Sequence, residues 1–232
     1  METIVVLTGA GISAESGIST FRGTDGLWKH YRFEEVASPE AWERDPGMVL
    51  DFYNMRRKQL LEVKPNPAHY ALVELEKKFR VKIITQNVDD LHERAGSTEI
   101  LHLHGELKKA RSTADPGLVY VIRGWELKLG DLCEKGSQLR PHIVWFGEPL
   151  PDLMIATGFI RQAGIVIIIG TSLKVYPAAG LLQYAPSAAE KYLIDPEAVP
   201  EYYIRNLKIL REKASTGVPK LVRELLSDKV TK

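Results

Sequence analysis

The sequence predicts an α/β fold of the Rossmann-like kind, a doubly wound parallel sheet with a smaller inserted domain. Apolar, β-branched runs of strand length occur at residues 4–7, 81–85 and 165–169, and residues 191–194 form a fourth. Continuous apolar runs of this length are typical of buried parallel strands. Each run is followed by turn or cap residues and then by a helical pattern, and this alternation favours a doubly wound sheet.

A glycine-rich turn follows the first predicted strand. Gly9 and Gly11 let the backbone turn tightly and approach a pyrophosphate without a Cβ in the way. Together with Ala14 they fit the dinucleotide fingerprint Gly-x-Gly-x-x-Gly/Ala. The first N–H groups of the helix that follows are expected to point at the anion. A tight strand-to-helix turn without a ligand is the alternative, because the fingerprint alone does not separate the two.

Helices are expected where capping and breaking residues frame the pattern. Asp45 is an N-cap followed by a proline, and we expect a helix from there to about Glu62. The Pro-Asn-Pro of residues 65–67 breaks it, and a second helix is expected to reach about Phe79. Near the other end, Pro219 is expected to open a helix with apolar residues at amphipathic spacing.

Composition narrows the function classes. The 232 residues are 44% hydrophobic and 26% charged, which is ordinary for a globular protein. The net charge of +1 gives no electrostatic footprint for nucleic acid or an anionic membrane, so neither is expected as a partner. A strand is expected at the very start, without a signal peptide. Cys133 is the single cysteine, so we expect no disulfide within the chain and a cytoplasmic location.

Polar side chains follow the predicted strands at their carboxyl ends, where such sheets bind ligands. Residues 86–89, Gln-Asn-Val-Asp, follow the second strand and could bind the amide and hydroxyl groups of a ligand. The alternative is that Asn87 and Asp89 only cap the next helix. Residues 170–172, Gly-Thr-Ser, end the third strand, with an ordinary turn as the alternative. Arg22 lies in a polar loop from which it could reach a phosphate or a carboxylate.

Two histidines alternate with leucines just before Gly105. If this segment is extended, His102 and His104 share one face. A histidine titrates near neutrality and therefore suits general-base chemistry. A hydrogen-bonded structural histidine is the alternative, and spacing alone does not choose between the two.

Taken together, these motifs resemble those of the sirtuin family, the NAD-dependent protein-lysine deacylases. They occur in family order across almost the whole chain. The matching segments are residues 9–13, 17–23, 86–89, 104–105, 141–148, 170–172 and 175–177.

The resemblance implies NAD as cofactor and His104 as the catalytic base, with Gln86 and Asn87 facing the nicotinamide ribose. Asp195 sits where many relatives carry an asparagine for the adenosine ribose, and a carboxylate accepts the same hydrogen bonds but does not donate. The implied NAD contacts are Gly9, Ala10, Gly11, Ile12, Ala14, Phe21, Arg22, Gln86, Asn87, Asp89, Gly170, Thr171, Ser172, Asp195 and Ala214.

The resemblance also implies the partners and the reaction. Acylated-lysine proteins or peptides would be the substrates, and the acyl oxygen would attack the nicotinamide ribose and expel nicotinamide. His104 would act as general base on a ribose hydroxyl, and free lysine and O-acyl-ADP-ribose would be released. The acyl-lysine tunnel, with a strand that pairs with the substrate backbone, would be formed by Val144, Trp145, Phe146 and Gly147.

One pair of residues bears on the acyl group. Tyr53 and Arg56 are spaced i, i+3 on the predicted helix and therefore share a face. A tyrosine hydroxyl beside a guanidinium makes a receptor for a carboxylate. The pair resembles that of the sirtuins that remove succinyl, malonyl or glutaryl groups, some of which also remove acetyl groups. The alternative is a solvated Arg56 and a Tyr53 packed in the core.

The chain departs from the family at its structural zinc. Most sirtuins hold zinc with two C-x-x-C pairs, but here residues 110–115 lack cysteine and only Cys133 remains of the second pair. One thiolate does not make a tetrahedral zinc site, His142 lies inside the predicted strand of residues 141–148, and Asp115 or Asp131 would be weak substitutes, so we expect no bound metal. Residues 105–140, a loop-rich insertion by pattern, must then be mobile or held by apolar side chains between residues 118 and 125.

The expected domain division follows the same resemblance. Residues 1–28, 70–104 and 140–232 would form the NAD-binding domain. A helical module at 29–69 and a degenerate zinc module at 105–139 would form the smaller domain.

Two other functions fit the same motifs. A mono-ADP-ribosyltransferase would let an acceptor side chain capture the ribose carbon, and a non-catalytic module would bind NAD or ADP-ribose only. The presence of His104, Asn87 and Asp89 together argues against the module.

Overall fold

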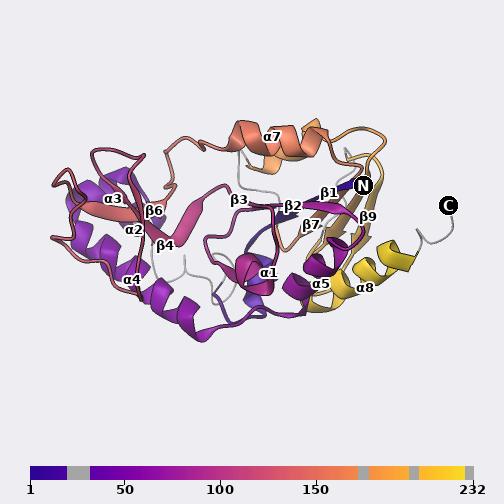
Figure 1. Ribbon diagram of the computed structural model, residues 1–232, viewed down its shortest axis with the longest axis horizontal. Helices are drawn as coiled ribbons and strands as arrows, with labels where there is room; N and C mark the ends of the chain where they lie inside the picture. Colours follow the sequence, from indigo (N-terminus) through magenta and orange to yellow (C-terminus); the bar gives the residue numbers. More distant parts are fainter. Residues whose placement is uncertain (20–31, 172–177, 199–203, 228–232) are drawn as a thin grey trace.

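The computed structural model describes residues 1–19, 32–171, 178–198 and 204–227, and its larger sheet has six strands. Neighbouring strands all run parallel, in the order β3-β2-β1-β7-β8-β9 (Figure 1). The predicted doubly wound parallel sheet is therefore confirmed, and β1, β2, β7 and β8 are its four predicted strands. The strands are β1 (Thr3–Thr8), β2 (Arg80–Thr85), β3 (Ile100–His102), β7 (Ile165–Ile169), β8 (Glu190–Ile194) and β9 (Leu207–Leu210).

Helices cover both faces of this sheet (Figure 1). On one face pack α1 (Ala10–Ala14), α5 (Pro67–Leu75) and α8 (Ala214–Ser227). On the other pack α7 (Leu153–Arg161) and the short 3-10 helix η2 (Ala178–Tyr184). Within the described ranges, no helix combines the length and the apolar character needed to cross a membrane.

Strand β1 lies at the centre and contributes to two apolar cores. Ile4 and Val6 point into the core beneath α5 and α8, and Val5 and Leu7 into the core beneath α7. All four side chains are fully buried. Because successive side chains alternate between faces, a strand covered on both sides must be apolar throughout, which is why its run stands out in the sequence.

The order of strands along the chain changes direction between β1 and β7. From β1 the chain adds β2 and β3 on one side, and from β7 it adds β8 and β9 on the other. At the carboxyl ends of these two strands, the N–H of Gly11 donates to the carbonyl of Gly170 at 2.8 Å. A Cβ on Gly11 would lie 2.5 Å from the Gly170 Cα, and Gly170 itself has a φ of +59°. Ligands of doubly wound folds bind at such a switch point, so this crossing locates the candidate site.

A smaller unit lies beside one edge of the sheet, at the left of Figure 1. It is built from three helices and an antiparallel sheet in the order β5-β4-β6. Residues 105–140 are rich in loop, as expected, but they also contain strands that were not predicted from the sequence. These strands are short or lack a regular apolar period, since β4 has two adjacent lysines and β5 spans only three residues, so the sequence pattern did not reveal them. The elements of this unit are α2 (Phe33–Val36), α3 (Pro39–Arg44), α4 (Pro46–Glu62), β4 (Gly105–Ser112), β5 (Val119–Val121) and β6 (Leu139–Ile143). The remaining helix, α6 (Leu91–Ala95), connects β2 to β3 of the larger sheet.

Helix α4 begins after the predicted N-cap Asp45 and ends at Glu62, as the prolines at 65 and 67 predict. The Asp45 carboxylate accepts a hydrogen bond from the Met48 N–H at 2.9 Å, closing the first turn. α5 ends at Leu75, four residues before its predicted end at Phe79, and turns fill the interval.

The prediction that Pro219 opens the last helix is wrong. α8 begins at Ala214, and Pro219 lies inside it. The first turn is held from outside, because the Glu15 carboxylate accepts hydrogen bonds from the N–H and the hydroxyl of Ser215 at 2.9 and 2.7 Å. This distant carboxylate satisfies donors at the helix start, and no local sequence pattern reveals it.

An apolar cluster holds the three-stranded sheet against α4. Leu50 of α4 packs with Ala110, Ile122 and Leu127. Of the apolar residues between 118 and 125, Ile122 is buried here, whereas Val119 and Val121 of β5 are exposed. The expectation of an apolar anchor is thus confirmed at one position and wrong at the edge strand.

Gly170→Ala should destabilise the protein by more than about 2 kcal/mol, because the new Cβ would meet the Ile12 nitrogen at 2.4 Å and the residue would keep a positive φ. Gly158→Ala in α7 is the matched control, since its Cβ would meet nothing within 4 Å. It should stabilise the protein by roughly 0.5–1 kcal/mol. Chemical denaturation measures the stability of both variants. An unchanged denaturation midpoint for Gly170→Ala would contradict the close contact between the glycine turn and the end of β7.

Candidate active site

The glycine turn is fixed by its contact with the end of β7. The N–H of Gly11 donates to Gly170, and the N–H of Ile12 donates to the Gly9 carbonyl at 3.2 Å. The expectation that the first N–H groups of α1 point at an anion is therefore wrong for these two, because the nearby backbone already satisfies them. The N–H of Ala10 has no hydrogen-bond acceptor among the described residues.

Asn87 ties the end of β2 to the glycine turn. Its side-chain N–H₂ donates to the Gly9 carbonyl at 3.0 Å and to the Ser13 hydroxyl at 3.1 Å. The Ser13 hydroxyl donates in turn to Asp89 at 2.9 Å, and the other Asp89 oxygen accepts from the Leu91 N–H at 3.1 Å. Asp89 thus satisfies the first N–H of α6, whose N-cap position is Asp90, so the helix-capping alternative holds in part for Asp89 and does not hold for Asn87. Ser13 was missed, although it lies inside the glycine-turn segment.

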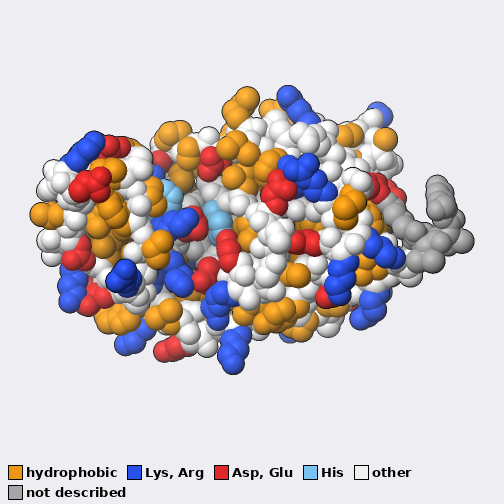
Figure 2. Space-filling view, viewed as in Figure 1, with side chains coloured by type: hydrophobic (Ala, Val, Ile, Leu, Met, Phe, Trp, Pro, Cys, Tyr) orange, Lys and Arg blue, Asp and Glu red, His pale blue; other side chains and the backbone are white. Residues whose placement is uncertain are grey.

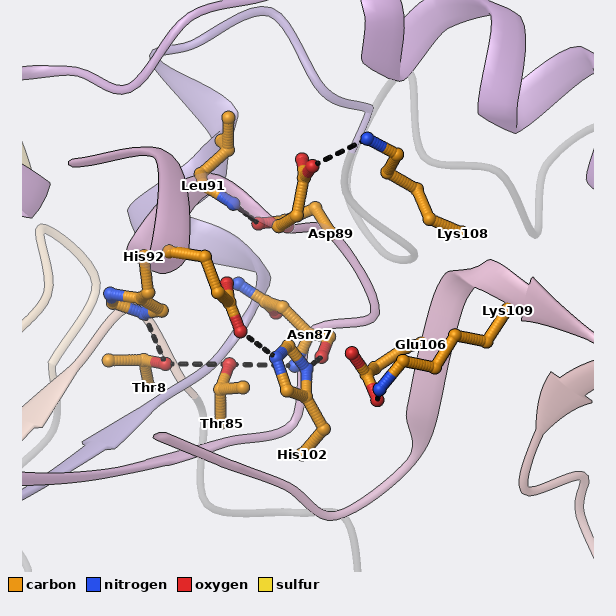
Figure 3. Close-up of polar contacts among 12 residues, drawn as sticks. Thr8, Thr85, Asn87, Asp89, Leu91, His92, His102, Glu106, Lys108 and Lys109 are labelled. Carbon is orange, nitrogen blue, oxygen red and sulfur yellow. Dashed lines mark hydrogen bonds and ion pairs between the residues drawn. The ribbon is translucent and has the colours of Figure 1, made fainter. Parts of the chain in front are cut away.

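A second buried hydrogen-bond chain runs beneath Asn87 (Figure 3). The Thr8 hydroxyl donates to Thr85 at 2.8 Å and accepts from His92 Nε2 at 3.2 Å, and the Thr85 hydroxyl accepts from the Asn87 N–H at 3.0 Å. Sequence reasoning missed this chain. The one available signal is that Thr8 and Thr85 each end an apolar strand, and they are register partners.

His102 and His104 do not lie on one extended segment, which corrects the expected alternation. β3 ends at His102, and the chain turns before Gly105, where a Cβ would lie 2.1 Å from the His142 carbonyl oxygen. Both rings nevertheless reach the residues after β2. Nδ1 of His102 donates to the Asn87 carbonyl at 3.1 Å, and Nδ1 of His104 donates to the Gln86 carbonyl at 2.9 Å.

The two histidines differ in what lies beside Nε2, and their pKa values shift in opposite directions. Burial lowers the pKa of His104, and the hydrogen bond to Gln86 offsets only part of that effect. Burial also lowers the pKa of His102, but the hydrogen bond and charge of Glu93 outweigh it, so this pKa is raised. Nε2 of His102 lies 2.7 Å from Glu93, whereas no described residue hydrogen-bonds Nε2 of His104. His104 is therefore neutral at pH 7 with one nitrogen available to accept a proton.

Other predicted site residues lie around the same carboxyl edge. The Gln86 side-chain amide donates to the Thr171 hydroxyl at 3.3 Å, which joins the ends of β2 and β7. Asp195 follows β8 and accepts from the Glu197 N–H at 2.8 Å. Ala14 and Ala214 are the last residue of α1 and the first of α8. Phe21, Arg22 and Ser172 lie outside the described residues.

Tyr53 and Arg56 share the face of α4 that packs on the loop after β6. Nε1 of Trp145 donates to the Tyr53 hydroxyl at 3.1 Å, and the Arg56 guanidinium carbon lies 5.9 Å from the centre of the Tyr53 ring. Burial raises the pKa of Tyr53 to about 12 and lowers the pKa of Arg56, which the charges of Tyr53 and Asp89 oppose. With 8% of its surface exposed, Arg56 is not solvated, so that part of the alternative is wrong.

The segment of residues 144–147 is not a strand. β6 ends at Ile143, and the chain then turns, with Gly147 at a φ of +90°. The Glu148 carboxylate accepts from the Trp145 N–H at 2.7 Å and holds this turn. The Val144 N–H donates to the His104 carbonyl at 3.0 Å, so the segment starts beside His104. Phe146 remains 47% exposed.

Cys133 and Asp115, where the sequence predicts the remnant of a zinc site, make poor metal ligands here. Sγ of Cys133 lies 3.3 Å from the Ser112 hydroxyl, and Asp115 pairs with Lys135 at 2.7 Å. In the part of the chain that the structure describes, Cys133 belongs to no group of three metal-ligating side chains. This donor set does not fit a zinc ion.

Comparison with known proteins places the chain in one family. A Sir2 family profile matches residues 9–177. An NAD-dependent protein deacylase of Bacteroides thetaiotaomicron is 56% identical, over 97% of this chain and 99% of its own. An NAD-dependent protein deacylase of Helicobacter pylori is also 56% identical, over 97% of this chain and 98% of its own. A Sir2 homologue in complex with NAD superposes with a TM-score of 0.87 at 42% identity, covering 97% of this chain and 90% of its own. A Sir2 complex with a p53 peptide and NAD superposes with a TM-score of 0.79 at 31% identity, covering 99% of this chain and 94% of its own.

A titration of the histidine ring signals by NMR should show opposite shifts for the two site histidines. We expect His104 to titrate below pH 6.5, because burial disfavours its charged form, and His102 above it, because Glu93 favours that form. His104→Gln and His102→Gln variants assign the signals. The reverse order of the two midpoints would contradict the described hydrogen bonds.

Proposed function

The chain belongs to the Sir2 family and is an NAD-dependent protein deacylase, and from this premise we propose where its reaction takes place and which acyl groups it removes. The reaction centre is the region between the glycine turn, the end of β2 and His104. The single observation that carries this placement is the pair of bonds from Asn87 to Gly9 and from His104 to Gln86, at 3.0 and 2.9 Å. They join the switch point of the sheet to a neutral histidine.

The residues at the switch point fit a dinucleotide. Gly9 and Gly11 let the turn pack directly on the end of β7, since a Cβ on Gly9 would meet Thr171 at 2.7 Å and one on Gly11 would meet Gly170 at 2.5 Å. The N–H of Ala10 is available to a phosphate oxygen, and Asp195, which follows β8, is proposed to accept from ribose hydroxyls. When bound, NAD supplies an electrophilic ribose carbon with nicotinamide as its leaving group.

His104 is the proposed general base. Its Nδ1–H is committed to the Gln86 carbonyl, so Nε2 carries the lone pair. Because its pKa is below the ordinary value of 6.5, the ring is in its base form at neutral pH, and that form is lost only as the pH falls through the lowered pKa. Asn87 and Asp89 act as positioning and binding groups, held by Ser13.

An acylated lysine of a protein substrate is proposed to enter beside residues 144–147. Val144 is hydrogen-bonded to the backbone of His104, and the half-exposed Phe146 gives an apolar contact for a lysine stem. Trp145 lies between this segment and Tyr53. The lysine would thus pass from the surface to the base along one continuous wall.

The geometry of α4 supports a preference for acyl groups that end in a carboxylate. The Tyr53 hydroxyl accepts from Trp145, and its own proton is committed to no other described residue. Arg56 presents a buried guanidinium beside the Tyr53 ring, and a guanidinium next to a hydroxyl makes a receptor for an acyl carboxylate. The Arg56 guanidinium is within electrostatic reach of Asp89, one of the proposed NAD contacts. Succinyl and malonyl groups have the required charge.

We further propose that the smaller unit folds without zinc. An apolar cluster around Leu50, the bond from Arg57 to the Trp125 carbonyl at 2.9 Å and the two bonds between Asn54 and Leu127 at 3.0 and 2.9 Å tie its antiparallel sheet and the loop after β5 to α4. These contacts replace the folding energy that a metal supplies to small modules. The two-domain division by residue ranges given above also remains a proposal.

Incubation with NAD and matched acetyl- and succinyl-lysine peptides tests the function. The proposal expects deacylated peptide and released nicotinamide, and His104→Ala should lower turnover on the order of a hundredfold or more with an unchanged melting temperature. Nicotinamide release with labelled protein and intact peptide would favour ADP-ribosyl transfer. Binding without turnover would favour a non-catalytic module. Near-normal rates in His104→Ala would remove this residue as the base.

Arg56→Met should lower desuccinylation far more than deacetylation, because it removes the cation that pairs with the acyl carboxylate. The measurement is kcat/KM on both peptides. Lys58→Met on the same helix is the matched control, since its ammonium lies over the Trp125 ring 5.4 Å away and should affect neither rate. Equal losses on both peptides in Arg56→Met would contradict the carboxylate role.

A further inference from the structure

We propose that Glu93, His102 and Glu106 form a binding site for one divalent transition-metal ion such as Zn²⁺. The three residues come from α6, β3 and β4, and one ligand atom of each lies within 4.8 Å of the others. Cys133 takes no part in this group, so the site is distinct from the remnant zinc site that the sequence predicts around Cys133. The inference does not depend on the proposed deacylase site.

The ring of His102 is already oriented as a metal ligand. Its Nδ1–H donates to the Asn87 carbonyl at 3.1 Å (Figure 3). This contact turns Nε2 toward Glu93, 2.7 Å away. Metal-bound histidines usually donate the other ring N–H to a backbone carbonyl or carboxylate in this way. Only 9% of the His102 side chain is exposed, so the ring has little freedom to leave this orientation.

Without metal, the two neighbours of the ring fix its protonation. The Asn87 carbonyl and the Glu93 carboxylate both accept, so both ring nitrogens donate and the ring is an imidazolium. On metal binding, the Nε2 proton is released to solvent, and the nitrogen lone pair forms the bond to the ion. Bonds of about 2.0–2.2 Å would bring the ligand atoms to about 3 Å apart, which the partly exposed carboxylates of Glu93 and Glu106 can reach.

A cavity provides room for the rest of the coordination shell. It has a volume of about 480 Å³ and lies against Glu93, His102, Glu106 and Lys109, and His142 forms part of its wall. Nδ1 of His142 is buried and has no hydrogen-bond partner, so a metal-bound water is a group that could satisfy it. Figure 2 shows histidine side chains in the hollow between the two parts of the molecule.

The donor set selects the class of metal. One imidazole and two carboxylates suit Zn²⁺ and its neighbours, whereas Ca²⁺ and Mg²⁺ prefer oxygen ligands alone. The structure also contains a competitor, because the Lys109 ammonium pairs with Glu106 at 2.5 Å. Removing this cation should strengthen metal binding, and that expectation distinguishes a metal site from a cluster of ion pairs.

Calorimetric titration of the full chain with Zn²⁺, followed by the visible absorption of bound Co²⁺, tests the site. We expect one ion per chain, affinity lowered on the order of tenfold or more in His102→Gln and Glu106→Gln, and affinity raised in Lys109→Met. Cys133→Ser is the matched control and should bind as the unaltered chain does.

Lys109 is partly exposed, so its variant keeps the test valid even if His102→Gln unfolds. Three results would overturn the site: no saturable binding, binding abolished by Cys133→Ser, or weaker binding in Lys109→Met. No NAD or peptide is added, so a failure here would leave the deacylase assay unaffected.

Discussion

The close approach of two backbone turns at the β1/β7 switch point is the constraint on which the rest of the structure depends. Gly11 and Gly170 meet through a hydrogen bond of 2.8 Å, at a separation that leaves no room for a Cβ on either side. This contact sets the direction of α1, and Asn87 fastens the end of β2 to the same turn. Because Gln86 and Asn87 then offer their carbonyls to His104 and His102, the rings are placed by the sheet and not by their own short strand.

Much of the fold could be predicted because its strands are buried on both faces. An apolar run such as that of β7, with helical patterns on either side, predicts a buried parallel strand. Asp45 marks the start of α4 because its side chain caps the first turn of the helix. The misses share a physical cause, since long-range contacts replaced local signals. Glu15 holds the start of α8 from 200 residues away, and the strands of the smaller unit depend on packing against Leu50.

The site divides in the same way. Residues in the switch-point motifs could be named from sequence, because backbone turns need glycine and strand ends carry the polar groups. The hydrogen-bond partner of each group could not be named from sequence, because bonds such as those of Ser13 with Asp89 and of Trp145 with Tyr53 join residues far apart in the chain. Spacing put His102 and His104 on one face, but Gly105 turns the chain, and the difference in their pKa values depends on Glu93.

The central claim is that the switch point seats NAD next to His104. Isothermal titration of NAD into the His104→Ala protein, with an acylated peptide present, tests it most directly, because turnover is removed while the glycine turn is left intact. The account predicts one saturable site per chain, lost when Gly11 is changed to valine in the same background. An absence of saturable heat in folded His104→Ala protein, or unchanged binding after the valine substitution, would contradict it.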